Sequence, residues 1–297
     1  MKPKPLSLDN FQIGFVGLGL MGRPMAVNLQ AVGARMHVYN RSQQVVDELA
    51  ATGMTAHSSP RQVAAAAEIL IAMLPDTGAV EAVLLGNDGI LAGTKPGRLV
   101  IDMGTTAVTA TRQIAERFAA AGADYVDAPV SGGEVGAKAG TLAIMAGGSA
   151  AAIERARPIF AVLGQRFTHV GDSGAGQIAK AANQVIVGLN IGAVAEALTL
   201  AQRAGADPRK VRDALRGGFA ESRILELHGQ RMLDAAFTPG GKCTTQRKDL
   251  DQALQLAAES ELELPITALV RDLYDRLIEA GGGDLDHSAL VKVIAGD

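Results

Sequence analysis

The sequence predicts two domains of different class. An α/β domain is expected over residues 11–173 and an all-α domain over residues 174–297, after a loose N-terminal extension at residues 1–10. Up to Gly171, short β-like runs alternate with helical segments, which is typical of a largely parallel sheet covered by helices on both faces. After Gly171 no convincing strand pattern follows, and glycines punctuate a series of helical segments.

The elements follow this division in chain order. Short apolar runs predict strands at Ile13–Val16, Arg35–Tyr39, Ile69–Leu74, Leu99–Met103, Asp124–Val126, Leu142–Ala146 and Phe167–Val170. The helices between them are expected at Pro24–Val32, Gln43–Ala51, Arg61–Ala67, Val80–Leu85, Ala110–Ala121 and Ala150–Val162. Further helices are expected at Gln177–Ala204, Pro208–Leu215, Arg223–Leu233, Arg247–Ser260, Pro265–Ala280 and His287–Ile294. The domain boundary falls near Asp172–Gly176, just before the longest of these helices.

Composition limits the classes of partner. Apolar residues make up 48% of the 297 residues, which is enough for a large core, and the net charge is −3 with no basic block. Nucleic acid and anionic membrane are therefore poor candidates as main partners. Cys243 is the single cysteine, so an intramolecular disulfide is excluded and a reducing, cytoplasmic location is favoured.

Two segments bear on targeting. The N-terminal stretch MKPKPLSLDN is not followed by a long apolar run, so we do not expect a secretory signal there. The most membrane-like segment, Val185–Leu200, contains Asn190 and Glu196 and is shorter than a bilayer span, so a buried helix is expected instead. The five histidines, at positions 37, 57, 169, 228 and 287, show no metal-ligand spacing, and no metal is expected.

Three glycines near the start of the chain have the spacing G-x-G-x-x-G, at Gly17, Gly19 and Gly22. The motif follows a predicted strand, opens a predicted helix and precedes a second strand, which is the context of a dinucleotide-binding Rossmann-type domain. Gly17 would make the tight turn, Gly19 would let the backbone approach the pyrophosphate, and Gly22 would allow close packing of helix and strand. A purely structural strand–helix turn is the alternative.

The end of the second predicted strand bears on the choice of cofactor. An NAD site usually has a carboxylate there, but this chain has Asn40, Arg41 and Ser42. Arg41 would attract a 2′-phosphate and Ser42 would donate a hydrogen bond to it. We therefore expect NADP(H) to be preferred, with NAD(H) possible; the alternative is that Arg41 is a solvated loop residue.

Several longer segments resemble the β-hydroxyacid dehydrogenase family over essentially the whole chain. They are GFVGLGLMGRPMAVNL, MLPD, DAPVSGGEVGAKAGTLAIMAGG, GAGQIAKAANQVIVGLN and QRKDLDQAL. Within the family, KAANQVIVGLNIGAVAEALTLA, RGGFAESRIL and DHSAL are most similar to the branch that reduces tartronate semialdehyde. The resemblance implies an NAD(P)H-dependent reduction of a small 2-hydroxy-3-oxo acid to glycerate, in a homodimer or homotetramer.

The resemblance also implies roles for individual residues. Lys180 would be the general acid/base, because an ammonium group polarises a carbonyl and supplies a proton. Asn183 and Gln184 share the helix face of Lys180 and would orient it or bind substrate. The substrate carboxylate would bind at Ser131, Gly132 and Gly133. The expected cofactor-binding residues are Gly17, Leu18, Gly19, Leu20, Met21, Gly22, Asn40, Arg41, Ser42, Met73, Leu74, Pro75, Thr105 and Lys248.

Each assignment has a plainer alternative from the residues alone. Lys180 and Lys248 would then be solvated charges near helix starts, Asn183 an interhelical hydrogen-bonding group, and Thr105 a helix cap. For the function, the alternatives are a dehydrogenase of 3-hydroxyisobutyrate or another short 3-hydroxy acid, and a non-catalytic NADP-binding scaffold. The presence of Lys180 argues against the scaffold.

Overall fold

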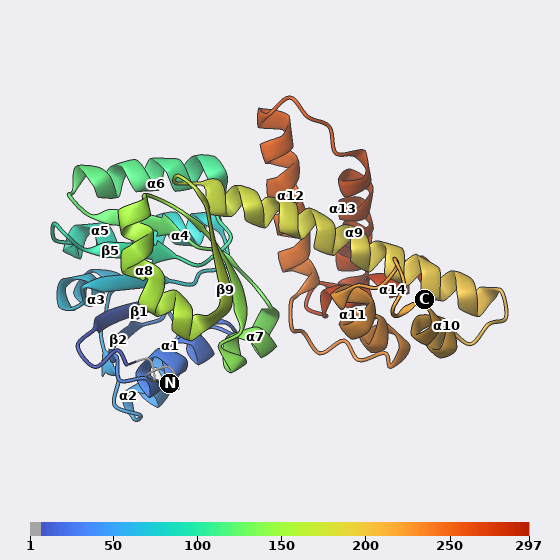
Figure 1. Cartoon of the computed structure of the whole chain (residues 1–297), viewed down its shortest axis with the longest axis horizontal. Helices are drawn as coiled ribbons and strands as arrows, with labels where there is room; N and C mark the ends of the chain where they lie inside the picture. The colour runs from blue at the N-terminus through green and yellow to red at the C-terminus, as the bar shows by residue number, and fades with distance from the viewer. Residues whose placement is uncertain (1–6, 297) are drawn as a thin grey trace. The chain divides into compact units, whose positions relative to one another are not determined.

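The computed structural model describes residues 7–296 and divides into two compact units, Met1–Lys180 and Ala181–Asp297. The division falls inside one helix, α9 (Ala175–Arg203) (Figure 1). Of the expected N-terminal extension, residues 1–6 lie outside the described residues. Leu8, which follows them, is buried, and its N–H donates to the Val32 carbonyl at 2.8 Å.

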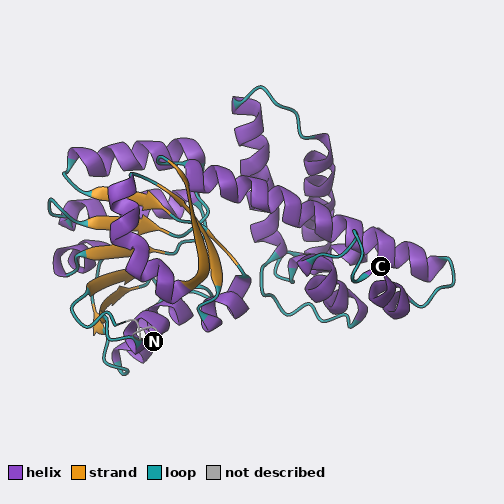
Figure 2. Ribbon diagram, in the orientation of Figure 1, coloured by secondary structure: helices purple, strands orange, loops and turns teal. Residues whose placement is uncertain are grey.

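The first unit contains a sheet of nine strands within its described residues (Figure 2). The strands are β1 (Gln12–Val16), β2 (Arg35–Tyr39), β3 (Thr55–Ala56), β4 (Ile69–Ala72), β5 (Leu99–Asp102), β6 (Asp124–Asp127), β7 (Val130–Ser131), β8 (Leu142–Gly147) and β9 (Gly164–Gly171). The first six lie in the order β3-β2-β1-β4-β5-β6 and are all parallel. This is the doubly wound order of dinucleotide-binding domains, so the predicted α/β class is confirmed.

The far end of the sheet is mixed, because β8 runs antiparallel to β6 and β7. Two further differences from the expected pattern occur here. β7 pairs with β8 over only two residues, and a helix, α7 (Gly133–Ala139), follows it where no helix is expected. The glycines that suggest a loop instead provide the positive φ angles of the turn into α7, 137° at Gly132 and 60° at Gly133.

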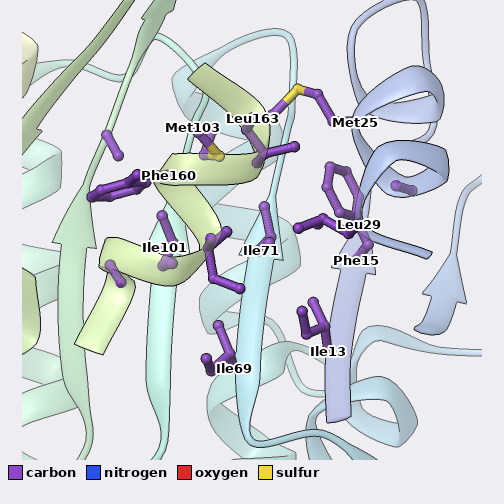
Figure 3. Close-up of a cluster of buried hydrophobic side chains, with 14 of the residues drawn as sticks. Ile13, Phe15, Met25, Leu29, Ile69, Ile71, Ile101, Met103, Phe160 and Leu163 are labelled. Carbon is purple, nitrogen blue, oxygen red and sulfur yellow. The ribbon is translucent and has the colours of Figure 1, made fainter. Parts of the chain in front are cut away.

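Helices cover both faces of the sheet. They are α1 (Gly22–Ala31), α2 (Gln43–Ala50), α3 (Pro60–Ala66), α4 (Thr77–Leu85), α5 (Ile90–Gly93), α6 (Val108–Ala120), α7 and α8 (Ala150–Leu163). One core joins α1, α2 and α8 to alternate strand residues such as Phe15, Ile71 and Ile101 (Figure 3). The opposite core joins α3, α4, α5 and α6 to the intervening residues, such as Val16 and Val100. This alternation is what a strand buried on both faces requires.

The second unit is helical over its described residues. It comprises α10 (Pro208–Leu215), α11 (Arg223–Leu233), α12 (Cys243–Glu259), α13 (Pro265–Leu277), a π-turn (Ile278–Gly282), a 3₁₀ turn (His287–Ala289) and α14 (Leu290–Ala295), together with most of α9. Its core includes Ile191 and Leu198 of α9 and Tyr274 of α13. α12 begins four residues before the expected start at Arg247, because Cys243 is already anchored by its N–H to the Leu285 carbonyl at 2.9 Å.

Helix α9 changes one expectation about its apolar segment. The segment Val185–Leu200 looks too short to span a bilayer, but the helix that contains it has 29 residues and is long and apolar enough to do so. Its apolar residues have another use, because Ile191, Ala195 and Leu198 are buried in the core of the second unit. That placement is the one expected of a core helix.

Candidate active site

The glycine motif forms the turn between β1 and α1. Gly17 has φ of 95°, and a Cβ there would lie 2.2 Å from the Met73 carbonyl oxygen. A Cβ on Gly22 would lie 1.9 Å from the Gly17 oxygen, whereas a Cβ on Gly19 would meet no atom within 4 Å. The first and third glycines therefore allow close packing of the turn, while the middle one borders open space and leaves its backbone accessible.

This turn also ends at a helix terminus suited to an anion. α1 begins at Gly22 with no side-chain cap on its N-terminus and no acidic residue in its first turn. Leu18 of the turn is buried, and Leu20 is exposed. Backbone N–H groups at an uncapped helix start attract phosphate, so the turn has the chemistry of a pyrophosphate site.

The expected cofactor residues on neighbouring strands lie at the same sheet edge. The turn follows β1 and the Met73–Pro75 segment follows β4, which are the two strands at which the order of the sheet reverses. The Met73 N–H donates to the Val16 carbonyl at 2.9 Å. Thr105 follows the next strand, β5, and is half-buried. In open α/β sheets, ligands bind at the carboxyl ends of strands around such a reversal.

The residues after β2 divide into two kinds. Asn40 Oδ1 accepts the Leu18 N–H at 3.1 Å, so Asn40 supports the glycine turn directly. Asn40 Nδ2 also donates to the Ser42 carbonyl at 3.4 Å. Arg41 and Ser42 are both exposed, beside the start of α2. The structure thus places a cation and a hydroxyl on the surface next to the residue that supports the turn.

Lys180 and the Ser131–Gly133 segment come together within the first unit. Lys180 is buried, with 8% of its surface exposed, and its Nζ donates to the Val130 carbonyl at 2.9 Å. Val130 is the residue immediately before Ser131. The positive φ angles of Gly132 and Gly133 turn the backbone directly after this contact. A buried ammonium group therefore contacts the backbone that leads directly into Ser131 and the glycine turn.

Four buried polar residues that we had not singled out from the sequence surround the start of α9. Asp102 and Asp127 end β5 and β6, and both are fully buried. Thr106 Oγ1 donates to Asp102 Oδ2 at 2.6 Å. Gln177 connects the two aspartates, because its Oε1 accepts the Thr106 N–H and its own N–H donates to Asp127 Oδ2. The available signal was a carboxylate closing each apolar strand run, in LVID and DYVD.

The two buried carboxyl groups have raised pKa values. Burial raises the pKa of Asp102 to about 6, and the charge of Asp127 acts in the same direction, against hydrogen bonds from Thr106 and Gly104. Burial likewise raises the pKa of Asp127 to about 6, against backbone hydrogen bonds from Gly174 and Gln177. Perturbed carboxyl groups of this kind are concentrated at functional sites.

The remaining expected residues lie in the second unit, where two of them contact the same aspartate. Gln184 Nε2 donates to Asp249 Oδ2 at 2.5 Å, and Lys248 Nζ lies 2.9 Å from Asp249 Oδ1. Asn183 Nδ2 donates to Gln184 Oε1 at 2.7 Å. Gln246 Nε2 donates to the Gln184 carbonyl at 3.2 Å. Asp249 and Gln246 were not among the expected site residues, although both lie in the QRKDLDQAL segment.

A second polar cluster in this unit contains two of the five histidines. Ligand atoms of His228, Asp286 and His287 lie within 4.8 Å of one another, a grouping that sequence spacing does not show. Asp286 Oδ2 already accepts from Arg231 Nη1 at 2.6 Å and from the Gly240 N–H at 2.9 Å. An arginine on the only carboxylate of the group disfavours a divalent cation there, because like charges repel.

Comparisons with known proteins cover nearly the whole chain. Residues 12–171 match the NAD-binding domain of 6-phosphogluconate dehydrogenase, and residues 174–294 match the NAD-binding region of NADP-dependent 3-hydroxyisobutyrate dehydrogenase. The chain is 48% identical to the 2-hydroxy-3-oxopropionate reductase of Escherichia coli strain K12 over 283 residues, covering 95% of this chain and 97% of that one.

Solved structures agree with the sequence relatives. A Mycobacterium tuberculosis 3-hydroxyisobutyrate dehydrogenase with L-serine is similar, with a TM-score of 0.86 and 31% identity, over 96% of this chain and 99% of that one. Among the sequence relatives, a 3-hydroxyisobutyrate dehydrogenase of Pseudomonas aeruginosa is 36% identical over 96% of this chain and 98% of that one. The chain therefore belongs to the β-hydroxyacid dehydrogenase family of NAD(P)-dependent oxidoreductases.

Proposed function

We propose that the protein uses NADPH to reduce tartronate semialdehyde (2-hydroxy-3-oxopropanoate) to glycerate. The observation that carries the proposal is the contact of Lys180 Nζ with the Val130 carbonyl, directly beside Ser131, Gly132 and Gly133. A proton donor beside a turn that binds a carboxylate would suit a small acid with an aldehyde two carbons from its carboxylate. The 48% identity to a 2-hydroxy-3-oxopropionate reductase supports this choice of substrate.

The turn between β1 and α1 fits the pyrophosphate of the cofactor. The accessible backbone at Gly19 and the uncapped start of α1 would hold the phosphates, with Leu18, Leu20 and Met21 lining the turn. Met73, Leu74, Pro75 and Lys248 are also proposed to bind the cofactor, and Thr105 is proposed to lie beside the nicotinamide. Arg41 and Ser42 would bind a 2′-phosphate, which supports NADPH over NADH.

The substrate carboxylate is proposed to bind the Ser131 hydroxyl and the N–H groups of Gly132 and Gly133. Glycines allow a ligand close to the backbone, and successive N–H groups form a concave site for an anion. Asn183 and Gln184 are proposed to contribute amide groups to substrate binding. Gln184 Nε2 donates to both Asp249 and Gln246, whereas Asn183 Nδ2 donates to Gln184 and has a second N–H, so Asn183 is the better donor to a substrate oxygen.

Lys180 is proposed to be the general acid in the reduction. When bound, the nicotinamide supplies a hydride to the carbonyl carbon. The electron pair of the C=O bond moves to oxygen, and Lys180 Nζ stabilises the developing charge and transfers a proton to that oxygen. In the reverse direction, neutral Lys180 would accept the hydroxyl proton of glycerate. Burial of Lys180 strengthens both interactions, since water competes less.

A 3-hydroxyisobutyrate dehydrogenase is the second candidate, because a relative with that activity is 36% identical over nearly the whole chain. The two candidates differ in the substrate group next to the reacting carbon, a hydroxyl or a methyl. A cytoplasmic homodimer or homotetramer is also proposed, on the family resemblance.

A panel of C3–C5 semialdehydes and hydroxy acids, assayed with both cofactors, tests the proposal. We expect tartronate semialdehyde to have the highest kcat/KM and NADPH a lower KM than NADH. Arg41→Ala should reduce the difference in binding free energy between NADPH and NADH by about 1–3 kcal/mol, the scale of a charge-assisted hydrogen bond. A higher kcat/KM for methylmalonate semialdehyde would favour the second candidate, and equal use of both cofactors would contradict the NADPH preference.

Lys180→Met tests the mechanism. We expect kcat to fall by roughly 10³-fold or more while cofactor binding survives, because both the proton and the charge are lost. Lys180→Arg should not restore it, since guanidinium does not release a proton near neutral pH. Lys95→Met, at an exposed position before β5, is the matched control and should keep wild-type kcat. A Lys180 variant with kcat within a few-fold of wild type would refute the assignment.

A further inference from the structure

Asp127 holds the start of helix α9 through both of its carboxylate oxygens. Oδ1 accepts the Gly174 N–H at 2.8 Å, and Oδ2 accepts the Gln177 N–H at 2.9 Å. These N–H groups belong to the turn into the helix and to its first turn, where backbone donors have no intrahelical acceptor. A carboxylate at this place is also favoured by the helix dipole. The end of β6 thereby fixes where α9 begins.

The surrounding backbone leaves the Asp127 carboxylate one position. A Cβ added to Gly147 would lie 2.7 Å from Oδ1, and one added to Gly176 would lie 2.7 Å from Oδ2. The carboxylate is thus closely flanked by the backbone of β8 and of α9. Backbone on both sides prevents the side chain from adopting another rotamer without moving the helix start.

The Gln177 side chain extends this anchor to the loop after β5. Its Oε1 accepts the Thr106 N–H at 3.1 Å, and its Nε2 donates to the Gly104 carbonyl at 3.0 Å. These two bonds flank Thr105, which is proposed to contact the cofactor. The first turn of α9 is therefore tied to two strand ends at once, β6 through Asp127 and β5 through Gln177.

Lys180 follows Gln177 by three residues, which is less than one helical turn. We propose that Asp127 is a positioning residue for Lys180, which it acts on through the start of α9, and that Gln177 sets the distance between Lys180 and the Thr105 loop. The proposal rests on the proposed role of Lys180 as the proton donor. It explains why two buried polar side chains that need not touch substrate occupy the end of β6 and the first turn of α9.

The charge of Asp127 is needed for this role. An ionised carboxylate accepts from two N–H groups, whereas an amide accepts with its oxygen only and turns an NH₂ group toward the second donor. Burial raises the pKa of Asp127 to about 6, so the group is ionised above that pH. The titratable or charged groups on the neighbouring elements are Asp102, Arg112, Tyr125, His169, Asp172 and Lys180.

Asp127→Asn tests the proposal with the full-length enzyme and NADPH. We expect kcat to fall by about 10- to 100-fold, the scale seen when a reacting group is displaced by about 1 Å. The NADPH Kd should stay within about twofold of wild type, because the glycine turn is untouched. Between pH 5 and 8, the fall in wild-type kcat below about pH 6 that is due to Asp127 should be absent from the variant. A variant kcat within twofold of wild type would overturn the proposal.

A second measurement needs no turnover. The rate at which an amine-reactive reagent labels Lys180, followed by peptide mass spectrometry, should rise at least fivefold in Asp127→Asn, since the side chain leaves its buried contact with Val130. Unchanged labelling would overturn the positioning role. This measurement uses no substrate, so it tests the positioning role of Asp127 separately from the proposed function. If the wild-type protein were inactive on every acid in the panel, only the proposed function would be refuted.

Ser149→Ala is the matched control for loss of a helix cap. Ser149 Oγ accepts the Ala152 N–H at 3.2 Å at the start of α8, away from Lys180 in the sequence. We expect a lower melting temperature with wild-type kcat and wild-type labelling of Lys180. If this variant lost as much kcat as Asp127→Asn, the effect would be general destabilisation and the proposal would be wrong.

Gln177→Met keeps the proposal testable if Asp127→Asn does not fold. It removes the bonds to Thr106 and Gly104 but keeps the backbone N–H that Asp127 accepts. We expect kcat to fall at least fivefold, a larger change than that in the NADPH Kd. A kcat within twofold of wild type would overturn the role of this linkage.

Discussion

Buried aspartates in the two units are held by different kinds of partner. In the first unit, Asp102 and Asp127 accept from backbone N–H groups, from the Thr106 hydroxyl and from the Tyr125 hydroxyl. In the second, Asp286 accepts from the Arg231 guanidinium, with His228 Nδ1 at 3.4 Å from its Oδ1. All three side chains have no exposed surface, so burial alone does not distinguish them.

Their pKa values move in opposite directions. Burial raises the pKa of Asp102 and of Asp127 to about 6. Burial acts the same way on Asp286, but His228, the charge of His287, Ser288 and the Gly240 N–H hold its pKa well below the usual range. Neutral donors offset only part of the cost of burying a charge, whereas nearby cationic groups reverse it.

Ionised Asp286 therefore stabilises the fold, whereas ionised Asp102 and Asp127 destabilise it. Asp286 joins Arg231 of α11 to the loop at Gly240 and to Ser288, and so connects three segments of the second unit. Asp102 and Asp127 lie at strand ends beside the expected cofactor and proton-donor residues. A protein keeps destabilising groups at functional sites more readily than in its core, and the first pair lies beside the residues that are proposed to bind cofactor and substrate.

The largest expected effect is on the folding of the second unit. Asp286→Ala should lower the free energy of unfolding by about 3 kcal/mol, because it leaves a partly buried arginine without its carboxylate; Arg231 is one-third exposed, which keeps the loss at the low end for a broken buried pair. Urea unfolding gives the value, and peptide-resolved hydrogen exchange over α11 and α12 assigns it to this unit.

Asp284→Ala provides the comparison for that experiment. Asp284 is two residues away and pairs with Lys242 at 2.7 Å, but its side chain is 87% exposed. An exposed ion pair contributes little, so we expect a change of about 0.5 kcal/mol or less. Equal losses for the two variants would mean that the Asp286 cluster is not the anchor of this unit.

A smaller effect should appear in the pH dependence of stability, with opposite signs for the two kinds of aspartate. The folded chain binds protons at Asp102 more tightly than the unfolded chain, so its contribution to stability is present below about pH 4 and is lost as pH rises through about 6. The pKa of Asp286 is lowered, so its contribution is present above about pH 4 and is lost as pH falls.

Variants separate these two contributions. Relative to wild type, Asp102→Asn should gain stability as pH rises from 4 to 7, by at most about 3 kcal/mol for a pKa raised by about two units. Asp286→Asn should show its deficit near neutral pH and recover relative to wild type below pH 4. Unfolding free energies of the wild type and both variants, measured from pH 3 to 7.5, test these expectations. If the two variants changed relative to wild type in the same direction with pH, the proposed difference between the two kinds of aspartate would be wrong.

Short-range patterns predicted the fold and the glycine turn between β1 and α1. Gly17, Gly19 and Gly22 lie within six residues, and the chemistry of each depends on atoms that the local strand–turn–helix pattern places there. Five of the six parallel strands were predicted for the same reason, but β3 (Thr55–Ala56), which has only two residues, was not. Helix α7 was missed because its sequence, GEVGAKA, contains glycines that lower helix propensity, and the tertiary context determines its structure.

Long-range contacts could not be predicted from spacing. Lys180 contacts Val130, fifty residues earlier, and Gln184 contacts Asp249, sixty-five residues later. The resemblance to a family indicated which residues matter, but it gave no partner for any of them. Asp102 and Asp127 did carry a local signal, a charged residue at the end of an apolar strand, yet their connection through Thr106 and Gln177 needs the folded chain.

The smallest expected effect concerns Cys243, which tests how far the Asp286 cluster controls its surroundings. The thiol is fully buried, and Sγ donates to the Asp286 carbonyl oxygen at 3.3 Å. Burial, with the nearby charge of Asp286, raises the pKa of the Cys243 thiol to about 12. At pH 8 the thiolate population is then about 10³-fold below that of an ordinary cysteine. We expect almost no reaction of the native protein with iodoacetamide over hours, and full reaction after unfolding.

In Asp286→Ala the loop before α12 loses its anchor and the thiol loses a nearby negative charge, so alkylation should become measurable in the native state. The Asp284→Ala variant should stay unreactive, because its ion pair is on the surface. Fast alkylation of the wild type would show that Cys243 is accessible, and an unreactive Asp286→Ala would show that the cluster holds the loop without Asp286.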